Sequence, residues 1–379
     1  MTARAATGQP PIPLITGYDP AAAGHPFLAG DARARSLNRA RIAAQPDATL
    51  DEDLSGRSAY ELLSAAAHEA LVRAASAELG ICPDSPQLLR DFDGCFQDRQ
   101  FASAAHRVAG VVGRRLGAVL LVLARGEAAD RRARPEWGDD QWAYWRDVRR
   151  VIVGGGLWAG NLGAAAAPVA AAFLAEAGCP ITVERSPWGA AVVLAGLARH
   201  APPDARRMLF DFGQTNLKRG MATYSAGILA GIEPRPPIPA PCPGRLDGAA
   251  GDARRQWAAM RDTILADWRH VPPGETGGTA IGLALAAHLQ DGHPFATDQG
   301  CYGRLQSLAP HLASFISADL SGHVGRFCAL ALIHDGLAAA ATVAGEAHTV
   351  VITLGTALGA GYPPTLTGLR PVAGSDMLT

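Results

Sequence analysis

Hydrophobic and polar residues follow two patterns along this chain, and together they predict an α/β fold. Apolar residues at helical spacing predict helices at about 55–80, 101–125, 163–177, 188–200, 252–270, 302–317 and 337–346. Short apolar or β-branched runs predict strands at 150–156, 180–184, 208–212, 217–224, 228–232, 327–333 and 348–354. The segment 277–288 fits either a strand or a helix. Because three strand runs follow one another between 208 and 232, we expect an antiparallel meander there, which the Pro-rich segment 234–243 ends.

The length of the chain suggests more than one core. With 379 residues, of which 48% are hydrophobic and 18% charged, two globular lobes are expected. Residues 1–50 are rich in Ala, Pro, Arg and Asp and indicate an irregular arm. The polar segment 126–149 interrupts the predicted elements and contains Trp137, Trp142 and Trp145. We expect these tryptophans to form a local core, the alternative being a platform on which a sugar stacks.

Charge and cysteine usage exclude several classes of protein. Lys plus Arg number 34 and Asp plus Glu number 35, so there is no electrostatic case for binding nucleic acid or a membrane surface. The six cysteines are scattered without a CxC or CxxC pair, which indicates neither a disulfide framework nor a clustered zinc site. The apolar stretches are too short for a membrane span, and the first residues lack a sustained apolar run. These features favour a reducing cytoplasm.

The sequence MLFDFGQTNLKRG places a carboxylate near the end of a strand. Asp211 is followed by a turn that contains Gly213, Gln214 and Thr215, and Lys218 belongs to the strand that pairs back. Such a turn can direct backbone N–H groups and a threonine hydroxyl at phosphate oxygens, while the aspartate holds a hydrated Mg²⁺ beside them. An ordinary hairpin whose Asp and Thr cap its turn explains the same residues when the motif is taken alone.

A second carboxylate stands at the end of another strand. Asp335 follows the apolar run FCALALIH and opens a helix, at the edge where ligands collect in α/β sheets. It can take the proton from a substrate hydroxyl that attacks a γ-phosphate, or it can serve simply as a helix N-cap. His334 is a candidate substrate hydrogen-bonder or an ordinary strand-end residue, and Glu346 is a further candidate for holding a sugar hydroxyl.

A second turn of glycine and threonine follows the last predicted strand. This turn contains Gly355, Thr356, Gly359 and Gly361, and it can bind phosphate from the other side. Two such turns with an acid between them are a stronger indication of a nucleotide site than either turn alone.

The run RVIVGGG ends a strand on three glycines. Gly154, Gly155 and Gly156 precede an Ala-rich helix. Glycines at this place let a ligand approach the backbone near the positive end of the helix dipole. Tight packing of the strand on the helix is the alternative explanation.

Together these motifs resemble the ROK family of sugar kinases, which belongs to the superfamily of actin-like and hexokinase-like ATPases. The family's first phosphate motif, DxGGTxxK, is similar to Asp211–Lys218, and its second, GTGxGxG, is similar to Gly355–Gly361. The strand-end Asn-Asp, whose aspartate is the family's catalytic base, resembles the pair His334 and Asp335. The adenosine-side IVIGGG of the family resembles Val151–Gly156.

The chain departs from the family pattern in several places. Gln214, His334 and Ala357 stand where the family has Gly, Asn and Gly. The family's zinc motif, a histidine followed by CxCGxxGC, is absent, so no zinc is expected, and the AGExGH segment that supplies sugar contacts is absent as well.

The order of the motifs also differs from that of the family. Here GGG precedes the first phosphate motif, whereas the family has it near the C-terminus, and a circular permutation explains the change. The resemblance thus implies a circularly permuted, two-lobed actin-like ATPase fold of the RNase H-like type, with extra helices. Residues 51–200 and 348–379 would form the family's C-terminal lobe, with the insert 126–149, and residues 205–347 its N-terminal lobe.

The function implied by the resemblance is that of an ATP-dependent sugar kinase. It would transfer the γ-phosphate of ATP, with Mg²⁺, to a hydroxyl of a hexose or N-acetylhexosamine-like sugar, with Asp335 as base. The expected partner is a small-molecule sugar, without nucleic acid or membrane, and a homodimer is one possible assembly. Two alternatives stay open: a catalytically degenerate regulator that binds sugar or nucleotide, and an ATPase without a sugar partner. A DNA-binding repressor is disfavoured because the first fifty residues contain no evident helix-turn-helix.

Overall fold

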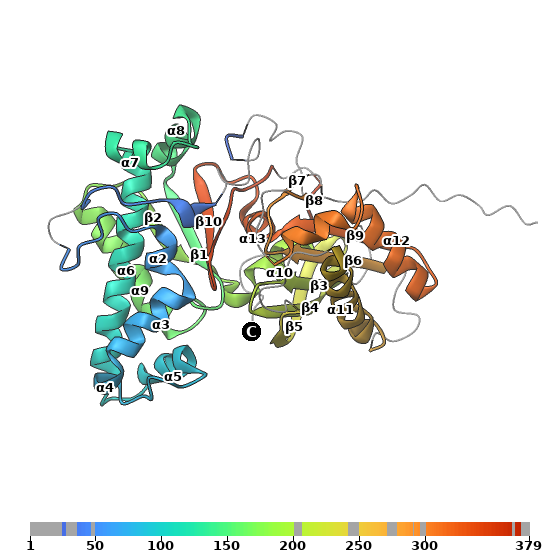
Figure 1. Cartoon of the computed structure of the whole chain (residues 1–379), viewed down its shortest axis with the longest axis horizontal. Helices are drawn as coiled ribbons and strands as arrows, with labels where there is room; N and C mark the ends of the chain where they lie inside the picture. The colour runs from blue at the N-terminus through green and yellow to red at the C-terminus, as the bar shows by residue number, and fades with distance from the viewer. Residues whose placement is uncertain are drawn as a thin grey trace, which may run out of the picture.

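The computed structural model of the chain contains two β-sheets flanked by helices, an α/β architecture (Figure 1). It describes residues 25–27, 36–46, 50–200, 207–241, 250–270, 279–290, 292–295, 301–365 and 368–372. Most of the arm predicted at 1–50 lies outside these ranges. Its described part includes a short 3₁₀ helix, η2 (Leu37–Arg39).

The amino-terminal half of the chain is mainly helical. Its helices are α2 (Ala59–Leu63), α3 (Ala65–Ala74), α4 (Ser76–Leu79), α5 (Leu88–Cys95), α6 (Ala102–Arg125), α7 (Ala128–Ala133), α8 (Asp139–Asp147) and α9 (Asn161–Glu176). The helices predicted at 101–125 and 163–177 are confirmed as α6 and α9. The single helix predicted at about 55–80 is wrong: it is three helices, because Ser64 has extended backbone and its hydroxyl caps α3 by accepting from Ala67 N.

The first sheet has the strand order β11-β10-β1-β2. Its strands are β1 (Arg150–Gly154), β2 (Thr182–Arg185), β10 (Thr349–Leu354) and β11 (Leu358–Gly361). Strand β1 pairs in parallel with β10 and β2, and β10 pairs antiparallel with β11. Helices α6 and α9 lie against each other, and Gly113 allows their close approach because a Cβ there would lie 2.5 Å from Ala166 O.

The second sheet has the order β5-β4-β3-β6-β9. Its strands are β3 (Arg207–Phe212), β4 (Asn216–Ser225), β5 (Ile228–Pro239), β6 (Thr279–Leu285) and β9 (Cys328–His334). The predicted meander is confirmed as β3, β4 and β5, and the ambiguous segment is the strand β6, buried between β3 and β9. The prediction that the Pro-rich segment ends the meander is wrong, since β5 continues to Pro239. As an edge strand, β5 tolerates prolines, which cannot donate to a ladder.

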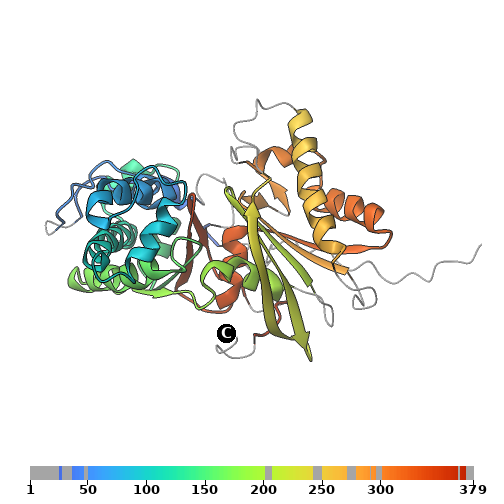
Figure 2. The same ribbon diagram turned by 90° about the horizontal axis from the view of Figure 1, so that it is seen from below.

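Two helices cover the outer face of the second sheet: α11 (Ala250–Trp268) and α12 (Leu312–Val324) (Figure 2). The helix predicted at 302–317 is wrong in its bounds. A 3₁₀ helix, η4 (Gly303–Ser307), is separated from α12 near Pro310, because the residue before a proline avoids helical backbone. A small ladder of β7 (Leu289–Gln290) and β8 (His293–Pro294) lies between β6 and η4 in the chain.

Helices α10 (Val192–Arg199) and α13 (Asp335–Ala340) lie between the two sheets (Figure 1). They are flanked by the short 3₁₀ helices η3 (Gly189–Ala191) and η5 (Ala341–Val343). One continuous core joins both helices to residues of the first sheet, such as Val351, and of the second, such as Leu209. The facing sides of the two sheets are therefore held together by apolar packing.

The C-terminal segment returns to the second sheet. Arg199 Nε donates to Arg370 O and Arg370 N donates to Arg199 O, each at 2.8 Å. Leu229 N donates to Pro371 O at 3.0 Å, and Leu229 forms a parallel bridge with Val372. The segment after β11 thus connects to α10 and to β5.

The three tryptophans of the insert are buried, with 6%, 3% and 0% of Trp137, Trp142 and Trp145 exposed. They belong to the core of the helical half, and Trp137 packs edge-on against Phe27, so the predicted local core is confirmed and the sugar platform is excluded.

Among the described cysteines, Cys82, Cys95, Cys179 and Cys328 are free, but Cys301 is disulfide-bonded. The scattered cysteine positions did not predict this bond. Disulfides are uncommon in reducing compartments, so the bond does not support the cytoplasmic expectation. Among the described helices, none has both the length and the apolar character that a membrane span requires.

Candidate active site

The first predicted phosphate turn joins β3 to β4. Asp211 lies opposite Lys218 in this antiparallel pair, and Lys218 Nζ is 3.1 Å from Asp211 Oδ2. The Asp211 side chain is only 3% exposed. The charge of Asp211 is the main cause that raises the pKa of Lys218, against the effect of burial, and the charge of Asp335 also raises it. Both predicted acids therefore act on the same ammonium group.

Hydrogen bonds to the backbone of Gly213 stabilise the turn between β3 and β4. Gly213 N donates to Asp211 O at 3.0 Å, and a Cβ at Gly213 would lie 2.8 Å from Asn216 O, so the tight turn requires glycine. Tyr302, which is buried, donates its hydroxyl to Gly213 O at 2.9 Å. Burial and the charge of Asp211 raise the pKa of Tyr302 well above its ordinary value, so it remains a neutral donor. Gln214 is exposed at the tip.

The second predicted phosphate turn joins β10 to β11 and meets the first turn. Gly355 N donates to Ala357 O at 3.2 Å, and Gly355 O accepts from Ala65 N at 2.9 Å. Thr356 Oγ1 lies 2.6 Å from Thr215 Oγ1. Since these hydroxyls come from different sheets and are 141 positions apart, the fold brings the two turns into direct contact.

Asp335 lies at the end of β9 and is the first residue of α13. His334 is the N-cap, so the alternative that Asp335 serves as N-cap is wrong. The Asp335 side chain is 20% exposed, and its Oδ1 lies 2.7 Å from Gly336 N and 3.1 Å from His334 Nε2. A Cβ at Gly359 would lie 3.9 Å from the same oxygen. The second turn's strand thus passes close to the carboxylate.

Glycines in β11 allow this close approach. A Cβ at Gly361 would lie 1.8 Å from Gly336 O, and one at Gly336 would lie 2.2 Å from Ala360 O. A Cβ at Gly359 would lie 2.3 Å from Thr353 Oγ1. Gly361 is buried within the strand, so backbone packing accounts for its identity, whereas Gly355 and Thr356 lie in the turn.

Gly154, the last residue of β1, and the two glycines that follow it lie beside the second turn. Gly155 has a φ of +96°, and a Cβ there would lie 2.5 Å from Leu354 O, the residue before Gly355. At Gly154 a Cβ would lie 3.0 Å from Val192 Cγ1, whereas at Gly156 it would meet no atom within 4 Å. Tight packing therefore accounts for glycine at positions 154 and 155. At Gly156, by contrast, a side chain would have free space.

The amino end of the helix that follows these glycines is already occupied. Asp93 Oδ1 accepts from Leu162 N at 3.0 Å, and Asn161 Nδ2 donates to Asp93 O at 3.0 Å. A Cβ at Gly160 would lie 2.6 Å from Asp93 Oδ2. The expectation that this helix end offers its dipole to a ligand is wrong, because a carboxylate of the chain itself caps it.

Glu346 is not brought to the two turns. Its carboxylate forms an ion pair with Arg150, which also pairs with Glu184 at 2.7 Å. Arg150 begins β1, whereas the turns lie beyond Gly154, where β1 ends. The structure therefore does not bring Glu346, a candidate for holding a sugar hydroxyl, to the two turns.

No known family model and no curated protein sequence matches the chain. The interpretation of the site therefore depends on its own geometry. Among the described residues, no group of three or more His, Cys, Asp or Glu side chains could hold a metal ion by itself.

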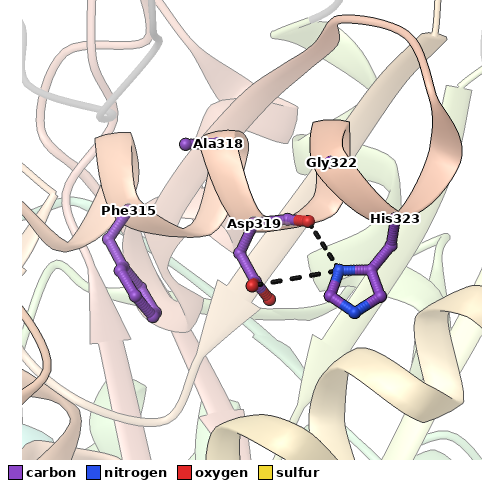
Figure 3. Close-up of a pocket in the computed structure, with 5 residues that line it drawn as sticks. All are labelled: Phe315, Ala318, Asp319, Gly322 and His323. Carbon is purple, nitrogen blue, oxygen red and sulfur yellow. Dashed lines mark hydrogen bonds and ion pairs between the residues drawn. The ribbon is translucent and has the colours of Figure 1, made fainter.

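A shallow pocket on α12 is lined by none of the residues of the two turns and does not include Asp335. It is lined by Phe315, Ala318, Asp319, Gly322 and His323 (Figure 3). The Asp319 carboxylate accepts a hydrogen bond from Trp257 Nε1 at 2.8 Å and forms an ion pair with Arg261. Contacts within the fold therefore account for this charge.

The sequence patterns did not identify two residues that lie close to the first turn or to Asp335 and its neighbour His334. Tyr302 supports the first turn, and the imidazole of His288 stacks on His334 with ring centroids 4.6 Å apart. Neither residue has a local motif. Their positions became visible only when segments distant in sequence were brought together.

Proposed function

We propose that the protein is an ATP-dependent kinase that phosphorylates a hydroxyl of a hexose or N-acetylhexosamine-like sugar. The observation that carries this proposal is the 2.6 Å contact between Thr215 Oγ1 and Thr356 Oγ1. Two turns able to bind phosphate meet there. Asp335 lies near β11, the strand that follows the second turn, and its charge raises the pKa of Lys218 beside the first. An acid beside two such turns is the arrangement that phosphoryl transfer needs.

The sheets support a circularly permuted actin-like fold. In the second sheet β3 has the antiparallel meander of β4 and β5 on one side and the parallel strands β6 and β9 on the other. In the first sheet β10 likewise has antiparallel β11 on one side and parallel β1 and β2 on the other. The strand orders of the two sheets match only if the count in the first sheet begins at β10, late in the chain, and among the described residues that sheet has no counterpart of β5. A start late in the chain is what a permutation would produce.

In the proposed reaction, Asp335 takes the proton from the acceptor hydroxyl. The oxygen attacks the γ-phosphorus, the bond from phosphorus to the β–γ bridging oxygen breaks, and ADP leaves with that electron pair. The Thr215 and Thr356 hydroxyls exchange their mutual hydrogen bond for bonds to phosphate oxygens. Lys218, which is paired with Asp211 and whose pKa the charge of Asp335 also raises, adds positive charge near the transferred group.

The residues present fit Mg²⁺ only as a companion of the nucleotide. Asp211 and the two threonines are oxygen ligands of the kind Mg²⁺ prefers, but Asp211 is buried and paired with Lys218. Asp211 would therefore act through water, with the phosphates supplying the inner ligands. Bound in this way, the ion would neutralise phosphate charge.

The test is ADP release in Mg-ATP with a panel of hexoses, N-acetylhexosamines and mannosamine-type sugars. Native protein is compared with Asp335→Asn and with Asp262→Asn, a control on α11 whose side chain is 67% exposed. Sugar-stimulated turnover that the control keeps and Asp335→Asn loses, by on the order of a hundredfold or more, supports the kinase. Sugar binding without turnover would instead indicate a regulator, and sugar-independent turnover an ATPase.

A further inference from the structure

A histidine outside every predicted motif lies against the site. His288 follows β6, and its backbone oxygen accepts from Phe295 N at 3.1 Å. The ladder of β7 and β8, in which Leu289 pairs with Pro294, lies between these two residues. The His288 ring stacks on the ring of His334, with centroids 4.6 Å apart and planes 23° from parallel.

His334 in turn contacts the proposed base. Its Nε2 lies 3.1 Å from Asp335 Oδ1, an ion-pair contact when the ring is protonated. The side chain of His334 is 9% exposed, so its ring is largely enclosed by protein. Gly336 N donates to the same oxygen at 2.7 Å. A hydrogen bond from Gly336 and a close contact with the His334 ring therefore meet on one carboxylate oxygen and limit its rotation.

We propose that His288 and His334 are positioning residues for Asp335, which act as one stacked pair. This inference depends on the proposed function, because it concerns the base of that reaction. A carboxylate fits this role only while its oxygens keep a fixed direction toward the acceptor hydroxyl. His334 supplies a close polar contact with Oδ1, and His288 supplies the surface that holds the His334 ring in place.

A second ring at His288 is useful because the His334 ring can otherwise rotate about its outer torsion. The outer torsion of a histidine has broad minima, so one polar contact at Nε2 does not fix the plane of the ring. A stacked neighbour restricts rotation through van der Waals contact over the whole ring face. The pair therefore differs from the asparagine expected at position 334, whose amide is shorter and has no face for stacking.

Kinetics on four variants test the pair. His334→Ala and His288→Ala are each expected to lower kcat by on the order of tenfold, with the KM for ATP unchanged, because the base is misdirected rather than lost. His288→Phe keeps an aromatic face and should retain most of the native kcat. The double variant should be no worse than His334→Ala, since residues that act as a unit are not additive. His270→Ala, which replaces an exposed histidine in the turn after α11, is the control.

A second readout does not depend on catalysis. In protein without nucleotide, the ¹⁵N resonances of the His334 ring should shift in both His288→Ala and Asp335→Asn, and remain unchanged in His270→Ala. If the shifts occur and no phosphorylation is detected with any sugar, the positioning contact stands and the proposed function fails. If phosphorylation occurs but the kcat effects are additive, or His288→Phe is as impaired as His288→Ala, the positioning proposal is overturned.

Discussion

Two strand–turn–strand hairpins meet at the candidate site, and different interactions stabilise their turns. The turn between β3 and β4 contains charge: a buried carboxylate at Asp211 paired with Lys218. The turn between β10 and β11 has no ionised side chain and is held by backbone contacts, among them Ala65 N to Gly355 O. The first hairpin can therefore respond to an ion or to phosphate charge, whereas the second offers a fixed shape.

The largest effect is expected from breaking the charged hairpin. Lys218→Met leaves the Asp211 carboxylate buried without its cation, and the free energy of unfolding should fall by about 3 kcal/mol. Urea unfolding measures it. Asp211→Asn combined with Lys218→Met should recover much of the loss, because no uncompensated charge remains. A double variant that is less stable than Lys218→Met would contradict the account.

The shape of the second hairpin is tested next, through its glycines. Gly361→Ala forces a Cβ to within 1.8 Å of Gly336 O, a backbone atom that cannot move alone. We expect a loss of about 2 kcal/mol or more in the free energy of unfolding, from overpacking. Gly355→Ala, where a Cβ would meet no atom within 4 Å, is the matched control and should be near neutral. Equal losses in the two variants would rule out backbone packing as the cause.

A smaller effect is expected from the support of β11. The Asn38 side chain donates to Leu358 O at 2.8 Å and accepts from Leu358 N at 2.9 Å, so it acts like a strand residue along the edge of the sheet. Asn38→Ala should lower the free energy of unfolding by about 1–2 kcal/mol, as for two lost hydrogen bonds. Thermal unfolding measures this, with Asn38→Asp as a variant that keeps one of the two contacts. An unchanged transition in Asn38→Ala would show that the contact adds no stability.

The smallest effect concerns the point where the hairpins meet. Thr356→Val removes one hydroxyl of the 2.6 Å pair, and the KM for ATP should rise by about tenfold, as for one hydrogen bond to a charged group. Thr215→Val should do the same, and initial-rate kinetics at several ATP concentrations give both values. If the hydroxyls bind phosphates separately, the two effects add; a double variant equal to either single one would show that only their mutual contact matters.

Much of the fold could be predicted because its signals are local. The hairpins, Asp211 opposite Lys218, and Asp335 at a strand end all follow from short patterns. Some errors had readable signals as well. Ser58 and Glu61 form a capping box at the start of α2, inside the helix predicted as continuous, and Pro310 precedes α12.

Other features could not be predicted from one sequence. Tyr302 and Gly213 are 89 positions apart, and no periodic pattern links them. Glu346 was predicted at the site because it follows Asp335 along the chain, yet α13 and η5 carry the chain across to the amino ends of β1 and β10. The path of the chain after Asp335 depends on tertiary packing, so the short distance in sequence between Asp335 and Glu346 did not indicate a short distance in space.

The return of the C-terminal segment to β5 limits how the molecule can move. The chain crosses between the sheets before β3, again before β10, and a third time before Val372 joins Leu229. With three covalent crossings, one sheet cannot slide far along the other without stretching at least one of them. Motion of one sheet relative to the other should therefore be a rotation about an axis near α10 and α13, and of small amplitude.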